Sequence, residues 1–142
     1  TGNLIYGIRH PEDVDLMVAL CPVTDIRVYH DWLGEHSGSL QDEIRTAIEQ
    51  SYGGQPADKP TRYEPHRVIH AAERLTMPLL VIHGTADALI PVEHGRALAK
   101  RLEKRPGFAY FEIPSGGHDA PLHSPELIPW LDRQLSAKGL MR

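Results

Sequence analysis

The stretch MPLLVIHGTAD, residues 77–87, joins an uninterrupted apolar run to a polar turn that ends in a carboxylate. The run at residues 77–82 has the length and composition of a strand buried on both faces of a parallel sheet. In open α/β sheets, ligands and catalytic groups gather just beyond the carboxyl ends of the strands. We therefore expect an α/β fold with Asp87 at that edge of the sheet.

Helical and extended patterns alternate on both sides of this stretch. Downstream, a helical segment at 92–105 precedes an alternating strand at 108–113, and a last helix runs from the N-cap Ser124 to about residue 137. Upstream, a short helix at 3–10 precedes an apolar strand at 14–20. This order implies right-handed parallel crossovers, hence about three parallel strands with flanking helices.

Residues 25–70 break this alternation with a polar and aromatic composition. We expect an irregular segment after residue 25, a helix from about Leu40 to Tyr52 capped by Ser39, and a loop at 53–65. Neither side of this loop has enough apolar sequence for a separate core. We therefore expect one domain, residues 1–142, with a cap-like insertion at about 25–70. Four aromatic residues of the insertion either line a substrate pocket or anchor it to the core: Tyr29, Trp32, Tyr52 and Tyr63.

Composition excludes several classes of function. The chain has 142 residues, 41% of them hydrophobic and 24% charged, with a net charge of −4. That balance gives no attraction for nucleic acid, and the longest apolar run is too short to span a membrane. Cys21 is the single cysteine, which favours a reducing compartment, so we expect a cytoplasmic protein with Cys21 as a small buried residue. The histidines lack metal-ligand spacing, and we expect no metal and no cofactor.

Asp87 and His118 follow two strands that are neighbours along the chain. Parallel strands lie about 4.8 Å apart, so loops that leave their carboxyl ends can bring a carboxylate to an imidazole. Such a pair suits nucleophilic catalysis, because the carboxylate orients the imidazole and the imidazole activates a hydroxyl. The alternatives are that Asp87 caps the following helix and that His118 is an ordinary loop residue.

Three motifs together resemble the C-terminal part of the prolyl-oligopeptidase-like serine hydrolases, within the α/β-hydrolase superfamily. They are residues 77–87, the Ile-Pro-Val at 90–92 and the Pro-Ser-Gly-Gly-His at 114–118. In that family the Asp of a His-Gly-x-x-Asp loop and the His of a Gly-His loop complete the catalytic triad. The resemblance thus implies these roles for Asp87 and His118. Residues 2–4, 10–11 and 21–25 also resemble the segment after the nucleophile in that family.

The chain contains no serine with the Gly-x-Ser-x-Gly pattern of a nucleophile elbow. In the family this serine precedes the position of Thr1 by one or two residues. We therefore expect the nucleophile to lie upstream of this chain, with the amide of Thr1 as an oxyanion donor if the serine directly precedes it.

The expected function is hydrolysis of acyl bonds in a peptide or ester substrate, by a prolyl-oligopeptidase-like peptidase. A carboxylesterase of the same superfamily is the close alternative, because both use the same acyl-enzyme chemistry. A non-catalytic interaction module with the same fold is the third candidate function. The strand at 14–20 would leave an apolar edge open, which predicts a complementary N-terminal half or self-association.

Overall fold

A three-stranded parallel sheet forms the centre of the computed structural model, which describes residues 1–36 and 38–140. The strands β1 (Met17–Leu20), β2 (Leu79–Gly84) and β3 (Phe108–Ile113) follow one another in space as they do in sequence. All pairs are parallel, and β2 lies between the other two. The predicted α/β class is confirmed.

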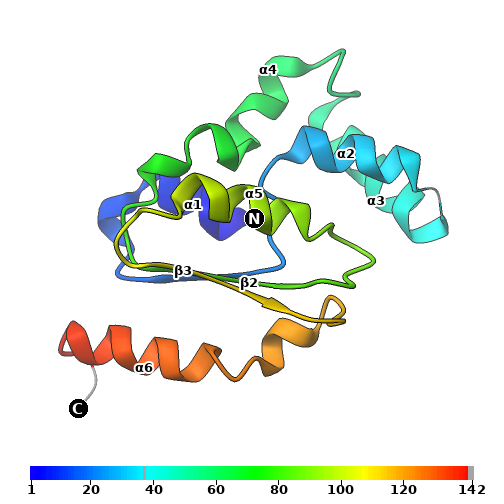
Figure 1. Cartoon of the computed structure of the whole chain (residues 1–142). Coiled ribbons are helices and arrows are strands. Elements are labelled where there is room, and N and C mark those ends of the chain that lie inside the picture. The colour runs from blue at the N-terminus through cyan, green and yellow to red at the C-terminus, as the bar shows by residue number, and fades with distance from the viewer. Residues whose placement is uncertain (37, 141–142) are drawn as a thin grey trace.

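Side chains of β2 alternate between two apolar layers. Leu79 and Val81 pack with α1 (Gly2–Arg9) and α5 (Glu93–Leu102) on one face of the sheet. Leu80 and Ile82 face the other side, where the buried Trp130 of α6 (Leu127–Ala137) covers them. Figure 1 shows the result as three layers, with α6 alone on its face. All six residues of β2 are buried, as the apolar run predicts.

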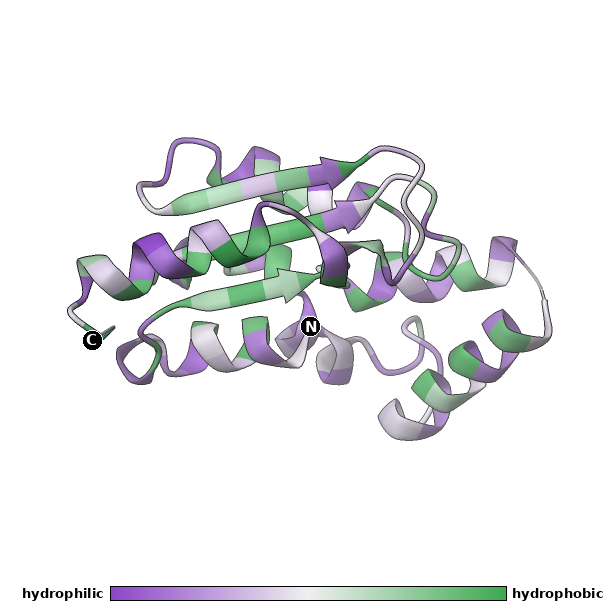
Figure 2. Cartoon of the chain, turned by 90° about the horizontal axis from the view of Figure 1, so that it is seen from below, coloured by the Kyte–Doolittle hydropathy of each residue, from purple (hydrophilic) through white to green (hydrophobic). Residues whose placement is uncertain are grey.

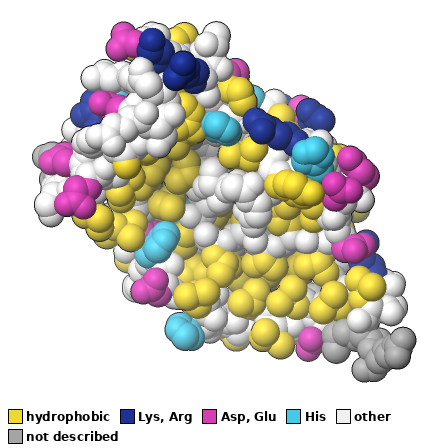
Figure 3. Space-filling model, turned by 180° about the vertical axis from the view of Figure 1, so that it is seen from behind, with side chains coloured by type: hydrophobic (Ala, Val, Ile, Leu, Met, Phe, Trp, Pro, Cys, Tyr) yellow, Lys and Arg dark blue, Asp and Glu magenta, His cyan; other side chains and the backbone are white. Residues whose placement is uncertain are grey.

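β1 is shorter than the predicted strand at 14–20. Pairing begins where the Met17 amide donates to the Pro78 carbonyl at 2.8 Å, and β2 itself begins only at Leu79. Residues 14–16 therefore have no strand beside them. Within the part of the chain that the structure describes, the outer edge of β1 is unpaired, and Val18 and Leu20 are half-buried. Figure 3 shows apolar side chains gathered in the layer of the sheet and α6.

The insertion contains more helix than its composition predicts. The irregular segment expected after residue 25 is the helix α2 (Ile26–Glu35), because Asp25 accepts hydrogen bonds from the first free amides of that helix. α3 (Ser39–Tyr52) is confirmed and ends at Gly53 with a φ of 75°, although its N-cap is Gly38 and not Ser39. A short helix, α4 (Pro60–Tyr63), interrupts the predicted loop at 53–65. Short 3-10 turns complete the fold at Pro11–Asp13, Glu64–His66, Val68–His70, Ala72–Arg74 and Ala120–His123.

Polar and aromatic contacts hold the insertion together. Nε and Nη2 of Arg67 make three hydrogen bonds to the Asp25 carboxylate, the shortest at 2.8 Å. The rings of Tyr52 and Tyr63 stack with centroids 4.0 Å apart. These two tyrosines therefore join α3 to α4 within the insertion, whereas Tyr29 of α2 anchors it to the rest of the domain by donating to the Leu89 carbonyl at 3.0 Å. Figure 2 shows the apolar strands against helices whose hydrophobic and hydrophilic residues alternate. Among the described residues, the helices are too short or too polar to cross a membrane.

We predict that Leu80→Ala lowers the free energy of unfolding by about 2–5 kcal/mol, because it opens a cavity in the fully buried β2. Leu122→Ala removes the same atoms from a side chain that is 61% exposed. It should change the free energy of unfolding by less than about 0.5 kcal/mol. Urea unfolding measures both variants. Equal losses would contradict the layer assignment.

We also predict that Asp25→Asn destabilises the fold by about 1–3 kcal/mol at neutral pH, because it removes the buried carboxylate that pairs with Arg67 and leaves only the exposed Glu64 beside the guanidinium. Burial raises the pKa of Asp25, but the hydrogen bonds from Arg67 and from the helix amides lower it by a larger amount. The pKa of Asp25 therefore lies below its usual value. The Asp25 carboxylate therefore contributes to stability at pH values above its pKa in the unfolded chain, about 3.9. This contribution is lost as the pH falls through the pKa of Asp25 in the folded chain.

Urea titrations at several acid pH values test this dependence. The gap between the native chain and Asp25→Asn should close as the pH falls. Asp15→Asn is the matched control, since the Asp15 side chain is 72% exposed and pairs with Lys138 at the surface. A gap that stays constant down to pH values below the pKa of Asp25 would overturn the prediction.

Candidate active site

Asp87 and His118 meet beyond the carboxyl ends of β2 and β3. Nδ1 of His118 lies 2.8 Å from Oδ2 of Asp87. The Asp87 side chain is fully buried, whereas that of His118 is 38% exposed. The two residues singled out in the sequence are thus brought together, with the imidazole on the solvent side of the carboxylate.

The surroundings of Asp87 fix its charge and the tautomer of the imidazole. Oδ1 accepts hydrogen bonds from the amides of Leu89 at 2.8 Å and Ile90 at 3.0 Å. Burial raises the pKa of Asp87, but the hydrogen bonds from these amides and from His118 lower it by a larger amount. The pKa of Asp87 therefore lies below its usual value. An ionised carboxylate only accepts, so Nδ1 of His118 must carry the proton that is shared with it. Nε2 of His118 is then left as the proton acceptor.

The two loops that carry the pair are tied to each other through their backbones. The Thr85 amide donates to the Ile113 carbonyl at 3.0 Å, and the Ala86 amide donates to the Gly116 carbonyl at 2.9 Å. A Cβ at Gly84 would lie 2.3 Å from the Gly116 carbonyl oxygen, closer than real Cβ atoms approach a neighbour. The glycine of the His-Gly-x-x-Asp motif is therefore needed because the histidine loop crosses directly over it.

Cys21 lies at the same edge, just after β1. Its side chain is buried, as the sequence indicates, but its thiol donates to the His118 carbonyl at 3.6 Å. The backbone of Cys21 has a φ of 43°, which is rare for a residue with a side chain. Burial raises the pKa of the thiol to about 12, so Cys21 is neutral. Sequence reasoning missed this contact, because nothing local to Cys21 indicates proximity to residue 118.

His83 lies behind the carboxylate and is fully buried. Its Nε2 donates to the Ile90 carbonyl at 3.0 Å and lies 3.6 Å from Oδ2 of Asp87. Burial lowers the pKa of His83, which favours its neutral form. It thus braces the loop that presents Asp87, in keeping with the structural role that its place at the strand end suggests.

Two groups of side chains have the composition of metal ligands. Cys21, Asp87 and His118 offer ligand atoms within 4.8 Å of one another, and a second group at residues 10, 12 and 13 is exposed. In the first group Nδ1 of His118 already bonds to Oδ2 of Asp87 and the Cys21 thiol donates to the His118 carbonyl, so a metal ion would have to displace protons from the thiol and from Nδ1 of His118. These contacts give no reason to assign a metal there.

The parallel sheet, its covering helices and a carboxylate–imidazole pair at its carboxyl edge define the C-terminal half of an α/β hydrolase. Residues 3–131 match the family model described as the prolyl oligopeptidase family, and the chain belongs to that family. The expected resemblance is confirmed.

Known proteins agree on the fold. Paleococcus ferrophilus monoacylglycerol lipase superposes with a TM-score of 0.60 at 19% identity, covering 93% of this chain and 64% of the lipase. Mouse alpha/beta hydrolase domain-containing protein 10 superposes with a TM-score of 0.62 at 20% identity, covering 95% of this chain and 57% of the mouse protein. Esterase LipC of Mycobacterium tuberculosis is 42% identical over 52 residues, which are 35% of this chain and 13% of the esterase. The chain thus spans little more than half of the similar structures.

We predict that Gly84→Ala destabilises the fold by about 1–3 kcal/mol and weakens the contact between His118 and Asp87, because the added methyl group pushes the Gly116 backbone away. Gly117→Ala is the control, since a Cβ there would meet nothing within 4 Å. Urea unfolding gives the stability, and the NMR signal of the His118 Nδ1 proton reports the contact. Equal behaviour of the two variants would contradict the close packing of the loops.

Proposed function

We propose that this chain supplies the acid and the base of a serine hydrolase that cleaves acyl bonds, with Asp87 and His118 as catalytic residues. The observation that carries the proposal is the 2.8 Å contact between Nδ1 of His118 and the buried, ionised carboxylate of Asp87. Membership of the prolyl oligopeptidase family supports the same roles.

The proposed mechanism uses the tautomer described above. Nε2 of His118 takes the proton of a seryl hydroxyl while the seryl oxygen attacks the acyl carbon. Asp87 stabilises the imidazolium that forms. His118 then gives that proton to the leaving amine or alcohol, which leaves an acyl-enzyme. Water hydrolyses the acyl-enzyme by the same route in reverse. The carboxylate keeps its negative charge throughout, which its lowered pKa favours.

The nucleophile of this mechanism is a serine from outside the chain, in a segment that precedes Thr1. The Thr1 hydroxyl exchanges hydrogen bonds with the amide and carbonyl of Val23, both at 3.0 Å, so residue 1 lies beside the loop that leaves β1. A preceding segment would therefore start near the edge that holds His118. We further propose that such a segment adds strands beside β1, which would cover its unpaired edge.

The preferred substrate class is a peptide, because the family match covers residues 3–131. A carboxylesterase is the second candidate, and the local similarity to Esterase LipC favours it. Hydrolysis of a prolyl anilide against that of a short-chain nitrophenyl ester separates the two, since an esterase lacks activity on the amide.

We predict that a fluorophosphonate labels one serine of the longer protein and that His118→Ala and Asp87→Asn slow the labelling by about 10³-fold or more. His123→Ala is the matched control, because His123 is exposed and lies outside the pair. Intact mass locates the adduct. A longer protein that takes no label would overturn the hydrolase proposal and favour an interaction module, and labelling that is equal in all variants would remove His118 from the mechanism.

A further inference from the structure

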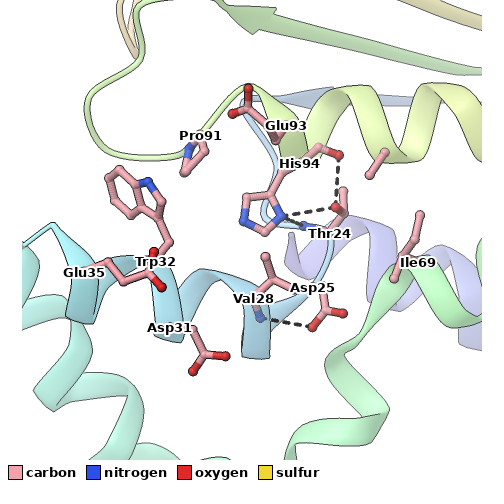
Figure 4. Close-up of a pocket in the computed structure, with 11 residues that line it drawn as sticks. Thr24, Asp25, Val28, Asp31, Trp32, Glu35, Ile69, Pro91, Glu93 and His94 are labelled. Carbon is pink, nitrogen blue, oxygen red and sulfur yellow. Dashed lines mark hydrogen bonds between the residues drawn. The ribbon is translucent and has the colours of Figure 1, made fainter.

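A cavity of about 600 Å³ lies between α2 and the start of α5 (Figure 4). This volume is within the range of about 300–1,000 Å³ that is usual for small-molecule sites. Asp87 and His118 do not line it. Pro91, four residues after Asp87, forms part of its wall, so the loop at 87–91 separates the cavity from the catalytic pair.

Carboxylates surround this cavity, and none of its lining residues is a lysine or an arginine. Asp25 pairs with Arg67 and Glu93 pairs with Arg96, which leaves two exposed rim carboxylates without a lysine or arginine partner among the described residues, those of Asp31 and Glu35. In Figure 4 the Glu93 carboxylate points away from the ring of His94, whereas Asp31 and Glu35 lie one turn apart on α2. Their summed field favours a cationic occupant.

His94 forms the polar part of the cavity wall and is 4% exposed. Its Nδ1 accepts from the Thr24 amide at 3.3 Å, and the Thr24 hydroxyl donates to the His94 carbonyl at 3.0 Å. Nδ1 therefore carries no proton, and Nε2 is an N–H donor. Among the described residues Nε2 has no hydrogen-bond partner.

The ring of His94 faces the cavity between Trp32 and Thr24 in Figure 4. Burial lowers its pKa to about 4, so at neutral pH it adds no positive charge to the acidic rim. The ring of Tyr29 lies edge-on to it with centroids 5.9 Å apart. A buried donor without an acceptor carries a free-energy cost that the acceptor of a bound ligand would relieve.

The remaining lining is apolar, with Trp32, Ile69 and the half-exposed Val28 among its members. A complementary ligand thus needs a cation, an apolar stem and a hydrogen-bond acceptor. A lysine or arginine residue within a peptide has all three.

We propose that this cavity binds a basic residue of a peptide, with its cation between Asp31 and Glu35 and a peptide carbonyl oxygen on Nε2 of His94. Nε2 is closed to solvent in the unliganded chain, so the carbonyl reaches it when a neighbouring side chain rotates. The site is separate from the hydrolytic reaction, and its test measures binding alone.

The probe is N-acetylarginine amide, titrated into the chain at low ionic strength, and the readout is NMR of the indole N–H signals. The chain has two tryptophans, so the Trp32 signal can be assigned by Trp32→Phe, and the buried Trp130 in the layer of α6 serves as an internal control. We expect a saturable shift of the Trp32 signal alone in the millimolar range. N-acetylcitrulline amide, which lacks the charge, should bind about fivefold more weakly.

Variants locate the site. Asp31→Asn combined with Glu35→Gln should weaken arginine binding about fivefold or more. The control, Glu12→Gln combined with Glu103→Gln, removes the same charge from exposed positions elsewhere and should leave arginine binding unchanged. Equal affinity for the arginine and citrulline amides, or no saturable shift, would overturn the proposal. So would arginine binding that the Asp31 and Glu35 variant leaves intact.

Discussion

The close approach of two strand-end loops is the constraint on which the pairing of Asp87 with His118 depends. β2 and β3 run in register from Leu79 opposite Phe108 to Gly84 opposite Ile113, so both strands end at the same level of the sheet. The backbone that follows β3 then crosses over Gly84, in space that a side chain would fill. Register and the missing Cβ together bring an imidazole to a carboxylate that lies thirty-one positions away in the sequence.

The turn after β2 explains how Asp87 remains ionised although its side chain is buried. Desolvation alone would favour the neutral acid, but the turn places the Leu89 and Ile90 amides on Oδ1. The other oxygen is left for His118, and His83 holds the end of the turn from behind through the Ile90 carbonyl. The charge, its orientation and its burial therefore come from a few residues of one loop, which β2 anchors in the core.

The sheet was predictable from the sequence because its patterns are local, and the pair was predictable because each member follows a predicted strand in a motif that resembles a known family. A continuous apolar run predicts β2, and a polar turn at its end places Asp87 at the sheet edge. The limits of β1 were less predictable, because they depend on where Pro78 begins to pair and not on residues 14–16 themselves. The contact of Cys21 with the His118 carbonyl was not predictable, since it joins residues from two loops that only the folded sheet brings together.

The insertion shows a different limit. Its aromatic and polar residues suggested irregular structure after residue 25, yet α2 forms because one carboxylate both caps the helix and pairs with Arg67, forty-two positions later. Propensity within the segment could not indicate that second partner. The arrangement also bears on function, because α2 then directs Asp31 and Glu35 towards a cavity whose opposite wall begins at Pro91, on the loop that carries Asp87. One loop thus has the carboxylate that we propose to be catalytic at its start and part of a cavity wall at its end.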